Sequence, residues 1–326
     1  MKAMYCREFG PIENIVWTDV PAPVCGPKQV RFSTSVATLG FMDALMIKGE
    51  YQIKPSLPYV PGSVSAGVVL EVGAEVHGIK VGQRVTASDH QGAFAEERVV
   101  GEETAVVTPD GMEDVQAAAL RLTFTPSYLA LVIRAELEKG ETLVVTGATG
   151  GIGFAAMQLG KYLGARVIGV VGSAAKAAFL QTHGFTEVID YSVENYKDRV
   201  NALTGGNGAD VIFEVIGGDI FEQSLRCINV GGRVLVLGFA GGRIGNVPAN
   251  LPLLKNASII GSFLGGWRKR HVEAGPQINA AVQKILTESG MKTPVARTFP
   301  MPQAVDALKT MLDRTNTGQI VLSMSS

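Results

Sequence analysis

The stretch Val145-Thr-Gly-Ala-Thr-Gly-Gly-Ile-Gly153 decides the fold of this chain of 326 residues. It overlaps an apolar run from Leu143 to Thr146, which predicts a buried strand. It opens a segment from Ile152 to Leu163 in which apolar side chains recur at helical spacing. A glycine-rich turn between a strand and a helix is the context in which such glycines bind a phosphate group. The stretch therefore predicts a strand, a phosphate-binding turn and a helix.

Read from Ala148, the turn has the spacing A-x-G-x-x-G. The small first residue permits a tight turn, Gly150 lets the backbone approach a pyrophosphate, and Gly153 lets the helix pack closely on the strand. The amides at the start of the helix then face the anion. The alternative is that the glycine-rich turn binds nothing. The strands that follow in the sequence argue against this alternative, because they complete the context of a dinucleotide site. We predict that a dinucleotide binds Ala148, Thr149, Gly150, Gly151, Ile152 and Gly153.

Five further apolar runs follow and alternate with helical segments, one of which spans residues 174–183 and ends at Gly184. Several runs are apolar throughout, so helices must cover both faces of the sheet that they form. Six strands with crossover helices predict a doubly wound α/β fold with a parallel sheet. The five further strands are expected at residues 166–171, 187–189, 210–214, 233–237 and 258–263.

The segments on either side of this region have different patterns. Between Val30 and Val107, short β-prone runs separated by glycines predict a compact, mostly β unit. Residues 115–131 have helical spacing and lead into the α/β region. The tail is expected to end in a strand that completes the sheet of the β unit. Its predicted elements are helices at 278–289 and 303–312 and the strand at 319–322.

Composition excludes several classes of protein. With 46% hydrophobic and 18% charged residues the chain is globular rather than disordered, and its net charge of −1 supplies no positive field for nucleic acid or an anionic membrane. No segment reaches the roughly 18 apolar residues of a membrane span, and Arg7 and Glu8 stand where a signal peptide would be apolar. Cys6, Cys25 and Cys227 are too scattered for a disulfide framework. We expect a cytoplasmic protein with neither nucleic-acid nor membrane partners.

The end of the second α/β strand indicates which dinucleotide binds. An NAD site usually has an acid there, about 20 residues after the turn, which accepts hydrogen bonds from the ribose. This chain has Gly172 followed by Ser173 and, three residues later, Lys176. A hydroxyl and an ammonium group favour the 2′-phosphate that a carboxylate would repel, so we predict NADPH. Alternatively, Ser173 only caps a helix and Lys176 is a solvated lysine.

Several separate segments of the chain resemble the zinc-independent quinone oxidoreductase branch, also called zeta-crystallin-like, of the medium-chain dehydrogenase/reductase superfamily. The likeness runs nearly end to end, and together these segments are more specific than any one of them. They are Phe41-Met-Asp43, Lys48-Gly-Glu-Tyr51, Pro61-Gly62, Ala66-Gly67, Val81-Gly-Gln-Arg-Val85, Gly92-Ala-Phe-Ala95, the Ala148 to Gly153 turn, Val171-Gly-Ser-Ala-Ala-Lys176 and Thr317-Gly-Gln-Ile-Val321.

The resemblance implies a fold and an activity. The fold is α/β, with a GroES-like β domain formed by residues 1–122 and 266–326 and a Rossmann doubly wound parallel-sheet domain formed by residues 123–265. The activity is hydride transfer from NADPH to a small electrophilic substrate, in an enzyme that is usually a homodimer.

Further cofactor contacts are expected where the parallel strands end, because ligands sit outside the carboxyl ends of such strands. The resemblance places the nicotinamide and its ribose at the last two of these ends. It also implies that two side chains join Ser173 and Lys176 around the adenosine phosphate. The expected residues at the strand ends are Gly217, Gly238, Phe239, Phe263 and Gly265, and the two added side chains are those of Tyr191 and Arg314.

Zinc dehydrogenases of the same superfamily need Cys and His ligands at set places. Here the Cys position is Gly40 and the His position is Ser63, so we predict no metal. The chain also departs from the zinc-independent reductases, which usually have Asn at Gly40, an acid at Val64 and Thr at Pro126. Thr125 and Ser127, with Thr123, are the hydroxyls near Pro126 that could replace the missing one.

Without a metal, hydride addition to a quinone or to an α,β-unsaturated carbonyl compound is easier than reduction of a saturated ketone, because the oxyanion formed is delocalised. Tyr51 matches a tyrosine of the relatives and is our first candidate for proton donor; alternatively it only packs a loop. Two other functions remain open. One is an NADPH-binding regulatory or scaffold protein with a degenerate catalytic site. The other is an enoyl-thioester reductase, which needs a cationic patch for the phosphopantetheine arm. Arg268, Lys269 and Arg270 could provide this patch; alternatively, this basic run is the solvated start of a helix.

Overall fold

The computed structural model describes residues 1–324, which form two compact units. Of the described residues, the first unit comprises 1–122 and 292–324, and the second comprises Thr123–Met291. Residues 266–291, which the sequence-based division placed in the first domain, group with the second unit. The reason is that Ile285 packs against the core of the second unit and Glu288 accepts a 3.3 Å hydrogen bond from the Tyr162 hydroxyl.

The second unit contains a six-stranded, wholly parallel sheet in the order β10-β9-β8-β11-β12-β13. The chain starts in the middle at β8, moves out to one edge, and returns to build the other half from β11. This is the doubly wound dinucleotide-binding order, with its switch point between β8 and β11. The strands are β8 (Thr142–Thr146), β9 (Arg166–Val171), β10 (Val188–Asp190), β11 (Ala209–Glu214), β12 (Ile228–Val236) and β13 (Ser258–Gly261).

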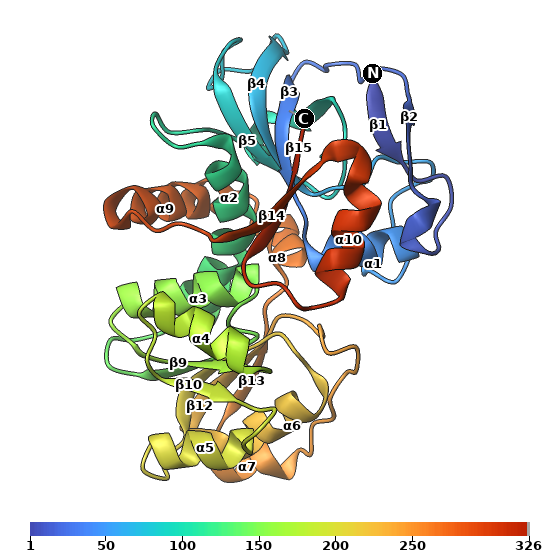
Figure 1. Ribbon diagram of the computed structural model, residues 1–326. Helices are drawn as coiled ribbons and strands as arrows, with labels where there is room; N and C mark the ends of the chain where they lie inside the picture. Colours follow the sequence, from blue (N-terminus) through green and yellow to red (C-terminus); the bar gives the residue numbers. More distant parts are fainter. Residues whose placement is uncertain (325–326) are drawn as a thin grey trace. The chain divides into compact units, whose positions relative to one another are not determined.

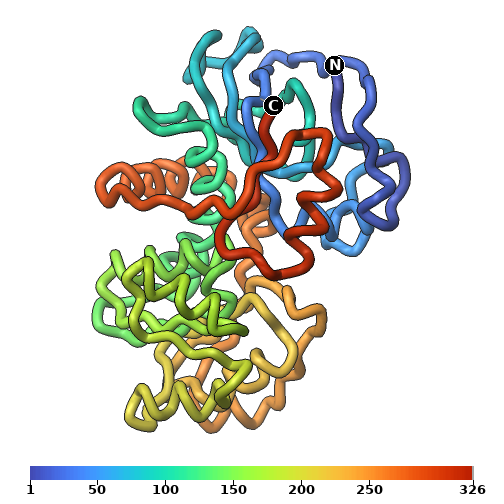
Figure 2. The backbone as a smooth tube through the Cα atoms, in the orientation of Figure 1, coloured from blue at the N-terminus to red at the C-terminus, as the bar shows by residue number. Residues whose placement is uncertain are grey.

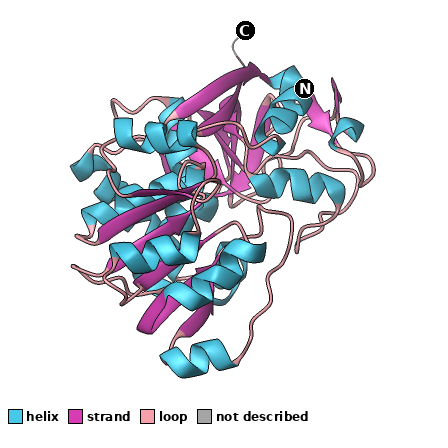
Figure 3. Cartoon of the chain, turned by 60° about the horizontal axis from the view of Figure 1, so that its bottom comes forward, coloured by secondary structure: helices cyan, strands magenta, loops and turns pink. Residues whose placement is uncertain are grey.

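Helices cover both faces of this sheet, as the uniformly apolar strands require (Figures 1 and 3). α3 and α4 lie on one face with Val145 and Phe213, and α5 and α6 lie on the other with Val144 and Ile212. The helices of this unit are α3 (Gly151–Tyr162), α4 (Ala174–Thr182), α5 (Tyr196–Leu203), α6 (Gly218–Cys227), α7 (Asn250–Lys255), α8 (Leu264–Arg270) and α9 (Ala274–Ser289).

The first unit contains a seven-stranded sheet, in which β14-β15-β3-β4-β5-β7 are neighbours and β6 pairs with β3, and a separate β1–β2 pair. β15 pairs antiparallel with β3, so the last strand completes this sheet as predicted. Its strands are β1 (Lys2–Tyr5), β2 (Val16–Asp19), β3 (Gln29–Thr38), β4 (Val64–Val72), β5 (Arg84–Ser88), β6 (Glu97–Gly101), β7 (Ala105–Val107), β14 (Val295–Pro300) and β15 (Gln319–Ser323).

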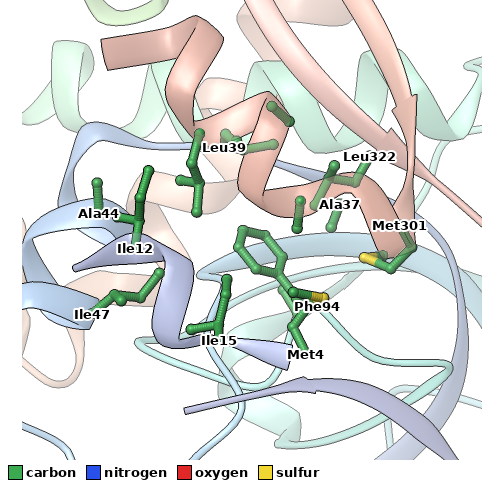
Figure 4. Packing of buried hydrophobic residues seen from close by; sticks show 14 of the residues in the cluster. Met4, Ile12, Ile15, Ala37, Leu39, Ala44, Ile47, Phe94, Met301 and Leu322 are labelled. Carbon is green, nitrogen blue, oxygen red and sulfur yellow. The ribbon is translucent and has the colours of Figure 1, made fainter. Parts of the chain in front are cut away.

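Both parts of the chain that form the first unit contribute to its core. The blue and red parts of the tube run together in this unit (Figure 2). Phe94 and Ile15 from the first part pack in one cluster with Met301 and Leu322 from the second (Figure 4). Its helices are α1 (Phe41–Lys48), α10 (Ala304–Leu312) and the short η1 (Ile12–Asn14), η2 (Glu102–Thr104) and η4 (Met301–Gln303).

The helix α2 (Asp114–Tyr128) begins in the first unit and continues into the second, where a π-helical turn, η3 (Leu129–Arg134), follows it. Pro126 lies inside α2. Proline has no amide hydrogen, so this position cannot form its helical hydrogen bond, and the π turn that follows is a common sign of an irregular, often functional, helix.

Candidate dinucleotide-binding site

The turn between β8 and α3 has the shape that an anion site needs. Gly147 has a φ of 60°, a left-handed conformation that favours glycine, and its carbonyl accepts the Gly150 amide at 3.0 Å. Gly150 is the exposed N-cap of α3, and no side chain caps this helix. The amides of the first helical turn therefore have no side-chain acceptor from the protein, which fits a pyrophosphate bound at this end.

The glycines of the turn and of α3 differ in how much space surrounds them. A Cβ on Gly150 would meet only the Gly147 carbonyl oxygen, at 3.4 Å, so this position is open to a ligand. A Cβ on Gly153 would lie 2.3 Å from the same oxygen, which means that Gly153 packs against the turn itself. The helix also packs closely on the strand at Gly160, where a Cβ would lie 2.4 Å from the Leu143 side chain.

The other predicted residues of the turn are in place. Ala148 and Thr149 are buried under it, and the Ala148 amide donates to the Val170 carbonyl at 3.3 Å. Gly151 and Ile152 are partly exposed in the first turn of α3.

The residues predicted for the adenosine phosphate meet at the ends of β9 and β10. Ser173 is the N-cap of α4 and accepts the Lys176 amide at 3.4 Å, so it does serve as a helix cap. The Tyr191 hydroxyl lies 2.7 Å from where a Cβ on Gly172 would be. The acid that ends β10, Asp190, is engaged by the Ser192 hydroxyl at 2.7 Å and its amide at 3.0 Å.

Arg314, by contrast, lies in the first unit, just after α10, with a φ of 56°. The structure therefore brings Ser173, Lys176 and Tyr191 into one part of the second unit, whereas Arg314 belongs to the first unit.

The carboxyl ends of β11 and β12 lie together. Gly217 is the N-cap of α6 with a φ of 79°, and a Cβ there would lie 3.0 Å from the Phe239 ring. A Cβ on Gly238 would lie 3.7 Å from the Val215 carbonyl oxygen, which is an ordinary contact. Gly217 therefore permits a close approach between two loops at the edge where a cofactor is expected, whereas Gly238 has room for a side chain.

At the next strand end, Phe263 is the N-cap of α8 and its side chain is exposed. Gly265 follows in the first turn of the helix. Both predicted residues therefore lie at the carboxyl edge of the same sheet.

One residue at this edge, Glu214, was not predicted from the sequence. It is completely buried at the end of β11 and accepts hydrogen bonds from the Thr146 hydroxyl and from the amides of Ile216 and Gly217. Burial raises the pKa of its carboxyl, and these hydrogen bonds oppose the shift. The available signal was an acid at the end of an otherwise apolar strand, Val211-Ile-Phe-Glu214.

The two hydroxyls predicted near Pro126 have different surroundings. The Ser127 hydroxyl faces the Thr123 carbonyl at 2.8 Å and the Ile152 carbonyl at 3.1 Å, and so ties α2 to the start of α3. Thr125 is also buried, but its hydroxyl has no hydrogen-bond partner. A buried polar group without a partner is costly, so Thr125 is the better candidate for a group with a role beyond packing.

Tyr51, the predicted proton donor, lies in the first unit shortly after α1. Its pKa is raised by burial and further by the charge of Asp43. Asp43 is itself buried and accepts the Gly40 amide at 2.7 Å and the Ser63 hydroxyl at 3.5 Å. Burial raises the pKa of Asp43 to about 7, so this acid can exchange a proton near neutral pH.

A buried arginine belongs to the same neighbourhood of Asp43. Arg98 is 2% exposed and donates to the Ser65 hydroxyl at 3.1 Å and the Ser63 carbonyl at 3.0 Å. Burial lowers its pKa to about 10, and the charges of Asp89 and Asp43 oppose the shift.

The positions that bind zinc in other dehydrogenases do not fit a metal here. Gly40 offers only its amide and Ser63 a hydroxyl, and both donate to Asp43 rather than face a metal as ligands. Among residues 1–324, no group of three or more His, Cys, Asp or Glu side chains is placed to hold a metal ion. Within the same residues, no helix combines the length and the apolar character needed to cross a membrane.

Two family models match the chain. One, described as "Alcohol dehydrogenase GroES-like domain", matches residues 26–112, and the other, described as "Zinc-binding dehydrogenase", matches residues 151–279. The first match lies in the unit with the seven-stranded sheet, and the second in the unit with the parallel sheet.

Whole-chain similarities agree with these matches. A "Quinone oxidoreductase-like protein 2 homolog" from Nematostella vectensis is 36% identical over 330 residues, covering 99% of this chain and 88% of that protein. A "Quinone oxidoreductase" from Pseudomonas aeruginosa is 34% identical over 328 residues, covering 98% of this chain and 99% of that protein. A mycobacterial protein solved with NADPH has a TM-score of 0.92 at 26% identity, with 99% of this chain and 100% of that one covered.

Proposed function

Because the chain belongs to the quinone oxidoreductase family of the medium-chain dehydrogenase/reductase superfamily, we propose that it is a zinc-independent NADPH-dependent reductase of quinones or α,β-unsaturated carbonyl compounds. Two observations together carry this proposal. The glycine turn is open at Gly150, and the end of β9 is followed by the hydroxyl of Ser173 and the ammonium group of Lys176 in place of an acid. The first feature accepts a pyrophosphate and the second a 2′-phosphate.

In this proposal the second unit holds the whole length of the cofactor. Residues 148–153 receive the pyrophosphate, and Ser173, Lys176 and Tyr191 surround the adenosine 2′-phosphate. The nicotinamide half lies at the ends of β11, β12 and β13. The residues there are Gly217, Gly238, Phe239, Phe263 and Gly265.

When bound, NADPH supplies the hydride for the electrophilic substrate. The chain's own residues then need to align the acceptor, exclude water and deliver one proton to the developing oxyanion. Tyr51 is the proposed proton donor, and the charge of Asp43, an acid whose pKa is raised by burial to about 7, acts on its hydroxyl. Thr125 is proposed to donate a hydrogen bond within the site, since its hydroxyl has no partner in the protein.

The test measures loss of reduced-nicotinamide absorbance with NADPH and, in parallel, NADH. The acceptors are 1,4-benzoquinone, 9,10-phenanthrenequinone, an alkyl enone and crotonyl-CoA, with a metal chelator present throughout. We expect chelator-resistant turnover that prefers NADPH and favours the quinones or the enone. Turnover confined to crotonyl-CoA would instead identify an enoyl-thioester reductase, for which the basic last turn of α8 would be relevant. Tight NADPH binding without turnover would identify a regulatory or scaffold protein.

The proposal also includes a homodimer in a soluble, cytoplasmic protein. Sedimentation equilibrium of the purified protein tests the oligomeric state, and a mass equal to that of one chain would contradict it.

A further inference from the structure

Glu214 lies at the switch point of the parallel sheet. All the groups that form hydrogen bonds with its carboxyl group do so as donors. Its Oε1 accepts from the Ile216 amide at 2.9 Å, from the Gly217 amide at 3.1 Å and from the Thr146 hydroxyl at 3.1 Å. Its Oε2 accepts from the Gly217 amide at 3.0 Å. Such a set of donors suits an ionised carboxylate, which has acceptors on both oxygens and no hydrogen to place.

Thr146 joins the strand before the glycine turn to the same carboxylate. Its hydroxyl oxygen accepts the Val215 amide at 3.0 Å, and its own hydrogen has two acceptors within reach, the Glu214 carboxylate at 3.1 Å and the Phe213 carbonyl at 3.3 Å. The end of β8 and the end of β11 are thus joined by a threonine and a glutamate in addition to the ladder of the sheet. Gly147 lies directly beside this link, since a Cβ there would come within 2.7 Å of the Val215 side chain.

The next loop along the sheet edge rests on the residues that Glu214 holds. Ala240 donates its amide to the Val215 carbonyl at 2.9 Å, and Gly241 donates its amide to the Ile216 carbonyl at 2.6 Å. A Cβ on Gly217 would lie 2.6 Å from the Arg243 carbonyl oxygen, so the two loops touch through backbone. The loop that follows β12 therefore takes its position from the turn at residues 215–217.

We propose that Glu214 is the positioning residue of the nicotinamide half of the cofactor site: its buried carboxylate holds the turn at residues 215–217, and through it the loop at residues 238–243, in the shape that binds the cofactor. The inference rests on the proposed function, because it assumes that NADPH binds at this sheet edge. Glu214 itself is buried under the turn and acts through the backbone of Ile216 and Gly217.

The shape and charge of glutamate are both needed for this role. In Glu214→Gln, one oxygen becomes an amide nitrogen, which donates hydrogen bonds and would face donors on the turn or on Thr146. The glutamine side chain has an acceptor oxygen at only one of the two positions, so it cannot accept hydrogen bonds at both, and part of the turn must move. The adenosine half of the site, around Ser173 and Tyr191, has no hydrogen bond to Glu214 and should keep its shape.

The experiment compares the binding of two ligands to the full chain by calorimetry: NADPH, and adenosine 2′,5′-bisphosphate, which has only the adenosine half. We expect Glu214→Gln to weaken NADPH binding about tenfold, the size of one lost charge-assisted hydrogen bond, with the affinity for the bisphosphate unchanged. Hydrogen exchange should become faster at the amides of Ile216, Gly217, Ala240 and Gly241. The matched control is Ser224→Ala, which removes a buried hydroxyl from α6 that contacts Tyr196 at 3.1 Å, away from the turn.

Equal weakening of both ligands, or an equal loss of NADPH affinity in Ser224→Ala, would show a general loss of stability and overturn the inference. Unchanged NADPH affinity in Glu214→Gln would overturn it as well. If this variant does not fold, Thr146→Val removes one donor from the carboxylate and should weaken NADPH selectively but by less. Failure of the proposed function looks different, because the unaltered protein would then bind neither ligand.

Discussion

The carboxylate of Asp43 accepts the backbone amide of Gly40 at 2.7 Å in a place where the acid is only 1% exposed. Burial is the larger influence, and it raises the pKa of Asp43 from its ordinary 3.8 to about 7. The acid can therefore hold a proton in the folded protein at pH values where the unfolded chain has released it.

This pKa shift makes stability depend on pH with a definite sign. Between about pH 4 and pH 7 the folded state binds one more proton than the unfolded state, so the free energy of unfolding falls as pH rises, by at most about 4 kcal/mol from this group. Asp43→Asn should remove this part of the pH dependence. Urea unfolding at several pH values measures it, and identical slopes for the variant and the unaltered protein would contradict the assignment.

Lys176→Ala tests the choice of cofactor. The loss of an ammonium group from the 2′-phosphate should weaken NADPH binding by about 1 to 3 kcal/mol and leave NADH nearly unchanged. Fluorescence titration with each cofactor measures the two affinities. Lys161→Ala is a suitable control, because that lysine lies in the last turn of α3, at the opposite end from the glycine turn. Equal losses for both cofactors in Lys176→Ala would argue against a 2′-phosphate contact.

Two glycines of the turn should respond differently to alanine. At Gly150 a Cβ has space, and the φ of −75° suits any residue, so Gly150→Ala should cost at most about 1 kcal/mol of stability. The same substitution should weaken NADPH binding, because the added methyl group occupies the phosphate side of the turn. At Gly153 the Cβ would overlap a backbone oxygen, so Gly153→Ala should lower stability by about 2 kcal/mol or more. Thermal unfolding and NADPH titration of both variants separate the effects. A large loss of stability in Gly150→Ala would contradict this division.

Ser127→Ala and Thr125→Val separate a structural hydroxyl from a functional one. Ser127 ties two helices together, so its loss should cost about 1 kcal/mol of stability and leave kcat unchanged. Thr125 has an unpartnered hydroxyl, so Thr125→Val should be neutral or stabilising while it lowers kcat. Thermal melts and steady-state kinetics measure both quantities. A fall in kcat confined to Ser127→Ala would reverse the roles.

The elements that sequence analysis predicted well have a signal within their own residues. β9 runs from Arg166 to Val171 as predicted, because its apolar run is continuous and is followed by a helix cap at Ser173. β14 was missed because Arg297 and Thr298 are polar and exposed, and a strand at the edge of a sheet needs little apolar pattern.

The site was predicted less completely because part of it depends on contacts between loops. The glycine turn could be read from its spacing, whereas the role of Glu214 depends on where the amides of Ile216 and Gly217 point. The close helix packing at Gly160 likewise depends on which side chain of β8 lies beneath it. Spacing along the chain contains neither piece of information.

The contribution of β15 to the first sheet has a consequence for synthesis on the ribosome. β4 pairs along one side of β3, whereas the other side pairs with β6 at residues 29–33 and with β15 at residues 36–38. β15 begins at Gln319, 281 residues after Thr38. Residues 123–291 contain their own sheet and can fold as soon as they emerge. The N-terminal segment, by contrast, must wait with part of its core open until residue 323 has been translated. A nascent chain therefore exposes Phe94 and its neighbours for most of its synthesis, which is when chaperones would be expected to bind it.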